Sequence, residues 1–430
     1  MQTAGAAAGI GSRPFFEVLE SPLPRLIHER KVLWRGIWLS LRSCILDRLY
    51  EIARKRSLTR RDLLRATAVA GAGWPIYSSA SLRAIVNPKP QKVVVVTFGG
   101  GARDEETFAP EGNENIPHLL RELIPQATFC TQVINRGILG HYVATASLAT
   151  GAYEIFDNFA DVAPDNPTVF EYYRKALGRP PQDAWVIAPS NGFNRIGQSS
   201  GKLIAPGYGA EVLLPKHLLR TVLGSPQATG ADKLSFLYQD NYEDPSYVSP
   251  LGNEDRHLDQ LDSILHLAVS DFLKDAKTLT SADELSVYIM RQLMRQVAPS
   301  LLWITLHDMD VAHAGAFSLY LDGIRRTDRL CGEIWNFIQS EPEYKDRTSL
   351  LILPDFGRDS DFNASCNGFQ HHRSGDAMSR TTWMMALGPH IRQNTIVGRP
   401  LESLDLVPTI GALLGFPTPR AQGKPITEVA

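Results

Sequence analysis

Residues 93–101, Val-Val-Val-Val-Thr-Phe-Gly-Gly-Gly, are the stretch that decides the fold. A short apolar run without polar alternation is typical of a strand covered on both faces, as in parallel sheets. Similar runs follow at 185–188, 301–306 and 350–353, with helical patterns between them at 168–177 and 316–339. This alternation predicts an α/β fold over residues 90–430, with a mostly parallel central sheet sandwiched by helices.

The residues directly after each run are candidate site residues, because sites in such sheets lie at the carboxyl ends of the strands. The first run is followed by Gly100, Gly101 and Arg103, the second by Asn191, and the fourth by Arg358. We expect Gly100, Gly101 and Asn191 to contact a substrate. A polar stretch rich in Tyr and Asp, 238–255, is interpreted as a long loop over this edge, either a lid or a surface excursion.

The densest chemical signal follows the third and fourth runs. Carboxylate and imidazole groups together suit zinc, manganese or iron, whereas carboxylates alone suit magnesium or calcium. The pattern predicts a metal site near His307 with ligands drawn from Asp308, Asp310, His313, Asp355, His371 and His372. The alternative is a set of solvated loop acids beside histidines whose hydrogen bonds are satisfied in the core.

A stretch of small residues, 140–151, begins Gly-His-Tyr and ends Thr-Gly. Small side chains let a helix N-terminus approach other backbone, and its unpaired N–H groups and positive dipole end suit an oxyanion. Gly151 is expected to end this helix. The alternative is a packing helix in which His141 serves as a cap.

Composition excludes several classes of function. The chain has 430 residues and a formal net charge of −2, so it has no basic surplus with which to bind nucleic acid. No apolar run reaches the ~18 residues that a membrane-spanning helix requires. The chain is therefore expected to be globular, with membrane attachment only through an uncleaved export signal.

The N-terminal region is expected to direct export. Residues 1–56 form a basic extension, and 57–88 contain Thr59-Arg60-Arg61-Asp62-Leu63-Leu64 before a short run rich in Ala and Gly. Paired arginines in this setting resemble a twin-arginine signal, which implies the twin-arginine machinery as a partner and a periplasmic location. The alternative is a surface helix capped by Thr59.

The order of these motifs resembles the alkaline phosphatase and sulfatase superfamily. The resemblance rests on the first strand, the helix that ends at Thr150-Gly151, and a C-terminal segment with Leu-Asp-Leu-Val-Pro-Thr at 404–409. The closer resemblance is to a branch of largely unknown function with frequent twin-arginine signals. The resemblance implies an exported hydrolase of phosphate or sulfate esters that uses divalent metal ions.

The chain departs from the better-known members at three places. They carry an aspartate where this chain has glycines after the first strand, and a Thr, Ser or modified Cys where it has His141. They also pair the third-strand aspartate with a histidine, whereas Phe356 follows Asp355 here. The resemblance therefore implies one divalent ion (Zn, Mn, Ca or Mg) rather than two.

Two functions remain open at this stage. In a hydrolase, His141 acts as general base, nucleophile or metal ligand, and Arg103 or Arg358 binds the anionic ester in bidentate fashion. Thr145 and Ser147 are the alternative hydroxyl nucleophiles. The second possibility is a catalytically reduced binding protein that retains the fold and one metal.

Overall fold

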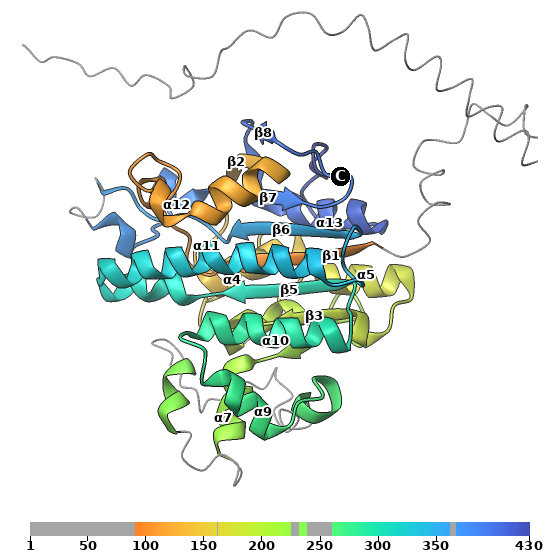
Figure 1. The fold of residues 1–430 in the computed structure, drawn as a ribbon. Helices are drawn as coiled ribbons and strands as arrows, with labels where there is room; N and C mark the ends of the chain where they lie inside the picture. The colour runs from red at the N-terminus through yellow and green to blue at the C-terminus, as the bar shows by residue number, and fades with distance from the viewer. Residues whose placement is uncertain (1–90, 161, 225–231, 239–259, 362–366) are drawn as a thin grey trace, which may run out of the picture. The chain divides into compact units, whose positions relative to one another are not determined.

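Strand β1 (Lys92–Phe98) lies near the middle of a nine-stranded sheet in the computed structural model (Figure 1). The structure describes residues 91–430 except 161, 225–231, 239–259 and 362–366. The predicted N-terminal extension and export signal, and nearly all of the predicted loop at 238–255, lie outside the described residues.

The sheet is mostly parallel, as the sequence predicts. Its strand order is β4-β3-β5-β1-β6-β7-β2-β8, with β9 paired to β2, and only β7 runs against its neighbours. The other strands are β2 (Thr128–Ile134), β3 (Ala184–Ile187), β4 (Glu211–Leu213), β5 (Leu301–Leu306), β6 (Thr348–Pro354), β7 (Thr381–Leu387), β8 (Thr395–Val397) and β9 (Leu401–Glu402).

Strand β1 is apolar on both sides because each of its faces meets a separate layer of helices. Val94 and Val96 pack into one hydrophobic core, whereas Val93 and Val95 pack into another. The first core includes helices α7 (Pro215–Leu223), α9 (Val269–Ala276), α10 (Ala282–Gln296) and α11 (Phe317–Ser340). The second includes α4 (His141–Thr150), α5 (Val169–Leu177) and α13 (Leu406–Leu414). The predicted sandwich is thus confirmed.

Local signals fix the ends of the helices around the site. Thr168 and Glu171 form a capping box at the start of α5, and Gly178 closes it in the left-handed conformation. Helix α4 begins at His141 and ends at Gly151, whose φ is 68°. Helix α11 agrees with the predicted range within one residue at each end. The short helices α6 (Asn191–Asn194) and α12 (Ala377–Arg380) complete the set of described α-helices.

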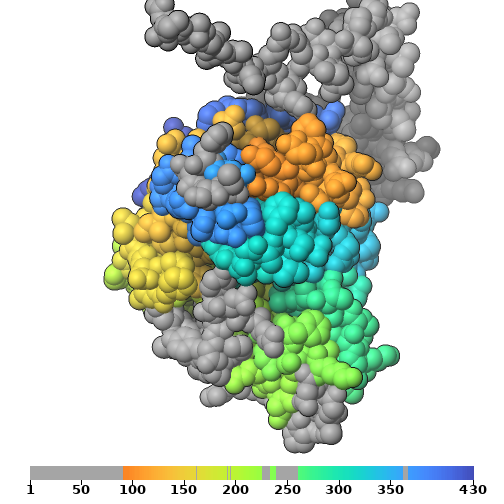
Figure 2. Space-filling view, turned by 90° about the vertical axis from the view of Figure 1, so that its left-hand side faces the viewer, coloured from red at the N-terminus to blue at the C-terminus, as the bar shows by residue number. Residues whose placement is uncertain are grey.

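The carboxyl ends of the parallel strands gather chemical groups from distant parts of the chain. Strand β5 leads into a 3₁₀ helix, η11 (Asp308–Ala314), and β6 leads into the loop that carries the last two predicted histidines. Figure 2 faces this edge and shows segments from after β1 (orange), after α4 (yellow), after β5 (teal) and after β6 (blue). Among the described helices, none is both long and apolar enough to span a membrane.

Candidate metal centre

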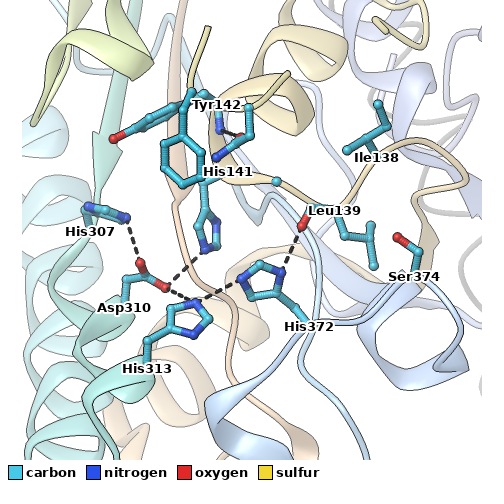
Figure 3. A pocket seen from close by; sticks show the side chains of 12 residues that line it. Ile138, Leu139, His141, Tyr142, His307, Asp310, His313, His372 and Ser374 are labelled. Atoms are coloured by element: carbon cyan, nitrogen blue, oxygen red, sulfur yellow. Dashed lines mark hydrogen bonds and ion pairs between the residues drawn. The ribbon is translucent and has the colours of Figure 1, made fainter. Parts of the chain in front are cut away.

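Four side chains meet at the carboxyl edge of the sheet and offer one ligand atom each. His141 is the first residue of α4, Asp310 and His313 lie on η11, and His372 lies in the loop after β6. Their ligand atoms all lie within 4.8 Å of one another. Figure 3 shows the three imidazoles turned toward the Asp310 carboxylate. Three nitrogen atoms and one oxygen atom form a ligand set that suits zinc or manganese.

The distances within the group fit ligands that share one ion. Asp310 Oδ1 lies 3.1 Å from His141 Nε2 and 3.2 Å from His313 Nε2. The Nε2 atoms of His313 and His372 are 2.9 Å apart. Two ligands of a tetrahedral zinc ion with bonds of about 2.0–2.1 Å lie roughly 3.4 Å apart. The four atoms therefore surround a position that a small divalent ion fits.

Two of the imidazoles are held in place by hydrogen-bond partners of Nδ1, on the side of the ring that faces away from the group. His141 Nδ1 lies 2.7 Å from Asp355 Oδ2, and His372 Nδ1 lies 2.8 Å from the carbonyl oxygen of Leu139. An imidazole that donates Nδ1–H to such an acceptor presents the lone pair of Nε2 to the other side, which is the usual arrangement of a metal-bound histidine. Both rings are thereby fixed with Nε2 toward the centre of the group.

The electrostatics of the group are those of a buried carboxylate beside a protonated imidazole. Burial raises the pKa of Asp310, but the charge of His141 and hydrogen bonds from His141, His307 and His313 bring that pKa well below its usual value. Burial lowers the pKa of His141, but the charges and hydrogen bonds of Asp310 and Asp355 outweigh burial and raise it to about 10. Burial, followed by the charge of His141, lowers the pKa of His372 to about 2. Without an ion, His141 therefore carries a proton at neutral pH.

The structure separates the predicted ligands into two sets. Asp310, His313 and His372 belong to the group, together with His141. Asp308 instead accepts a hydrogen bond of 2.9 Å from Arg326 Nη1. His371 and Asp355 also lie outside the four-residue group, although Asp355 holds the back of His141.

Neither predicted anion-binding arginine lines the pocket above this group. Arg103 is buried, with its guanidinium bound to Glu106 and, at 2.5 Å, to Asp361. Arg358 is 1% exposed and donates to the carbonyl oxygens of Gly101 (2.8 Å) and Phe369 (3.1 Å) and to Asp310 Oδ1 (3.0 Å). The structure thus places both arginines in internal ion pairs. Sequence alone could not identify the carboxylates that occupy them.

The helix N-terminus expected to bind an oxyanion is occupied by a side chain. Asn158 Oδ1 accepts hydrogen bonds from the backbone N–H groups of Tyr142 (3.0 Å) and Val143 (3.4 Å). Sequence reasoning missed Asn158 because it follows the helix that it caps, whereas capping signals are sought before a helix. Ser147, an alternative nucleophile, donates to Val143 O and lies outside the pocket, as does Thr145.

Two of the predicted substrate-contacting residues, Gly100 and Gly101, follow β1 and are not among the described lining residues of the pocket. Gly100 N donates to Asp355 Oδ1 at 3.4 Å, and the Gly101 carbonyl is taken by Arg358. Asn191 begins α6, after β3, and its side chain is outside what the structure describes.

A cavity of about 510 Å³ opens over the group, a size ordinary for small-molecule sites. The four residues of the group, together with His307 and Ser374, line the cavity, and the rest of its described lining is largely apolar. The remaining lining residues are Ile138, Leu139, Gly140, Tyr142, Asn158 and Phe159.

Comparison with solved structures finds several similar chains, all at low sequence identity. The chain is similar to alkaline phosphatase PafA (12% identity, 80% of this chain and 99% of that one, TM-score 0.47). It is also similar to the phosphonate monoester hydrolase of Agrobacterium radiobacter (14%, 78% and 76%, TM-score 0.47). A further similar structure is a protein in the alkaline phosphatase superfamily from Vibrio parahaemolyticus (13%, 80% and 71%, TM-score 0.45). No protein-family model and no curated protein matches the chain. These similarities concern the fold, so the chemistry has to come from the residues of the site.

Proposed function

We propose that the chain is a metal-dependent hydrolase of phosphate or sulfate esters. The observation that carries the proposal is the set of four ligand atoms at the floor of an open cavity. One divalent ion is proposed, since the four atoms surround a single position. Three imidazole nitrogens with one carboxylate favour zinc or manganese over magnesium and calcium, which prefer oxygen ligands.

The surrounding residues prepare this site in defined ways. When bound, a divalent ion supplies Lewis-acid polarisation of the ester oxygen and lowers the pKa of a coordinated water toward ~7. Arg358 pairs with the Asp310 carboxylate at 3.0 Å, in an ion pair that is shielded from solvent. Asp355 and the Leu139 carbonyl hold the rings of His141 and His372. His141 is proposed as a ligand rather than a general base, because its Nε2 already lies among the ligand atoms.

The second candidate function, a binding protein that retains one metal, is favoured by the two engaged arginines. An anion in this cavity would meet no Arg or Lys side chain among the described lining residues. A phosphate monoester dianion would therefore be held weakly during turnover. Turnover of aryl phosphate and sulfate esters by the metal-loaded protein decides between the two functions.

Replacing His313 by alanine tests the proposed function. We expect more than a 100-fold loss of zinc or manganese affinity, because changes to residues that merely orient ligands already cost about 10–100-fold. Elemental analysis of the purified variant measures the metal, and an aryl-ester assay measures turnover.

The matched control for this experiment is His118→Ala. His118 pairs with Glu122 at the surface and lies outside the group of four. We expect this variant to keep the parental metal content. An equal metal content in the His313 and His118 variants would show that His313 is not a metal ligand.

Export by the twin-arginine machinery is proposed for the whole chain, with residues 1–56 as an extension, 57–88 as the signal region and 90–430 as the hydrolase domain. Replacing Arg60 and Arg61 by lysine should leave the protein in the cytoplasm, because the export receptor reads the arginine pair. Fractionation followed by immunoblotting measures the distribution. A periplasmic yield equal to that of the parent would refute this export route.

A further inference from the structure

One wall of the cavity is apolar and partly open to solvent. Ile138 and Phe159 line the same cavity as the metal ligands and are 40% and 70% exposed. Leu139, which is buried, and Tyr142 extend this apolar lining, and the rings of Tyr142 and Phe159 meet edge to face at 6.2 Å. Figure 3 shows Ile138 and Leu139 on the loop that leads into His141, next to His372. We call Ile138, Leu139, Tyr142 and Phe159 the apolar rim.

The charge balance at the floor of the cavity is low. A divalent ion with three neutral imidazoles and the Asp310 carboxylate carries a net charge of +1. The charges of Asp355 and Arg358, which flank this group, cancel each other. The described lining residues include no Lys or Arg, because Arg103 is paired with Glu106 and Arg358 with Asp310 beneath the cavity floor. The described lining, with one ion in place, therefore offers compensation for one negative charge rather than two.

From these two observations we propose that the substrate is a monoanionic ester, a phosphodiester or a sulfate ester, whose organic group is apolar and packs against the apolar rim. This proposal rests on the proposed hydrolase function and adds the class of its substrate. Ile138 and Phe159 are then specificity-determining residues, because contact with an apolar group removes their exposed surface from water.

The reaction balances as a simple hydrolysis. The oxygen of one water molecule forms a bond to phosphorus or sulfur, and the bond from that atom to the leaving oxygen breaks. One proton of the water is transferred to the leaving oxygen. If the leaving group is a stable phenolate, that proton is released to solvent instead. The other remains on the acid product or is released. No oxidant, reductant or further reactant is required.

Three substrates with the same leaving group test the proposal. They are phenyl 4-nitrophenyl phosphate, methyl 4-nitrophenyl phosphate and 4-nitrophenyl phosphate, the last a dianion at about pH 8. We expect kcat/KM to fall in that order, by about tenfold between the phenyl and methyl diesters, since a few buried carbons give 10–200-fold discrimination. A preference for the dianion, or equal values for the two diesters, would overturn the proposal.

Variants of the rim assign the preference to its residues. Phe159→Ser and Ile138→Ser should each reduce the phenyl-to-methyl ratio of kcat/KM by about fivefold. Ile155→Ser is the matched control, because Ile155 is 87% exposed on the same connection and does not line the cavity. Its ratio should equal that of the parent. An unchanged ratio in both rim variants would exclude the rim as the specificity determinant.

A binding measurement separates failure of this proposal from failure of the hydrolase function. Benzenesulfonate and methanesulfonate are unreactive monoanions and can be titrated into the zinc-loaded full chain by calorimetry. If the parent binds benzenesulfonate more tightly than methanesulfonate and Phe159→Ser loses this preference, the apolar rim is supported even if no ester is hydrolysed. Ester turnover with equal binding of the two sulfonates instead supports the hydrolase and refutes the rim.

Discussion

Replacing His141 by alanine is expected to abolish metal binding and turnover together. Its Nε2 lies 3.1 Å from Asp310 Oδ1 within the group of ligand atoms, so its loss removes one of the four proposed ligands of the ion. We expect metal affinity to fall more than about 100-fold and activity to follow the metal content. Turnover lost with metal retained would instead identify a general base, and both retained would leave His141 as a helix cap.

Proton release provides a second measurement on the same residue. The pKa of His141 is about 10 in the protein without an ion, so its imidazole is protonated at about pH 8 and must lose that proton to bind metal. Metal binding should therefore release about one proton and weaken about tenfold for each pH unit of acidification. Calorimetry in two buffers of different ionisation enthalpy counts the protons.

Asp355→Asn is the matched control for the proton count. It removes the carboxylate charge that lies 2.7 Å from His141 Nδ1 and helps to raise its pKa. We expect fewer protons released per ion and a 10–100-fold weaker metal affinity. A proton count equal to that of the parent would contradict this assignment.

The second large effect is expected at Asp283, which no sequence motif identified. This carboxylate is 1% exposed and accepts hydrogen bonds from the backbone N–H groups of His307 (2.7 Å) and Asp308 (2.9 Å). It thereby fixes the turn from β5 into η11, which carries Asp310 and His313. Asp283→Ala leaves two buried donors without this acceptor, at about 1–3 kcal/mol each. We expect an unfolding free energy lower by roughly 2–5 kcal/mol and a metal affinity 10–100-fold weaker.

Glu171→Ala is the matched control for Asp283→Ala. Glu171 is 0% exposed and accepts hydrogen bonds from the backbone N–H groups of Thr168 (2.7 Å) and Ser199 (3.2 Å), outside the metal group. Denaturant unfolding should show a comparable loss of stability, whereas metal titration should show the parental affinity. If both variants lost metal affinity equally, Asp283 would act on general stability and not on the position of η11.

The central strands could be predicted because burial on both faces leaves a continuous apolar run, as in β1, β5 and β6. The far part of the sheet could not, since β2 has exposed positions and a register irregularity against β7, and β4, β8 and β9 are short. Their pairing depends on contacts between segments far apart in the chain. Sequence patterns of a single strand do not contain that information.

The residues of the metal group were all singled out from the sequence, but their roles required the local geometry. In a 3₁₀ helix, side chains three positions apart lie on the same side, which brings Asp310 and His313 together and leaves Asp308 to Arg326. The choice between Asp308 and Asp310 could not be made before η11 was known. Arg103 and Arg358 were expected to bind the anionic ester because a guanidinium group binds such anions in bidentate fashion. The carboxylates that they bind instead could not be identified from the sequence.

The glycines that follow β1 also limit the evolutionary history open to this chain. A β-carbon on Gly99 would lie 2.5 Å from the Phe193 ring and 2.8 Å from His307, and one on Gly101 would lie 2.0 Å from the carbonyl oxygen of Phe356. The better-known members of the superfamily that the sequence resembles carry an aspartate at this strand end. A single substitution here would meet a steric collision before it could offer a carboxylate. A carboxylate at Gly99 would require the rings of Phe193 and His307 to move, and one at Gly101 would require the backbone at Phe356 to move, so neither position can gain a ligand by one substitution alone.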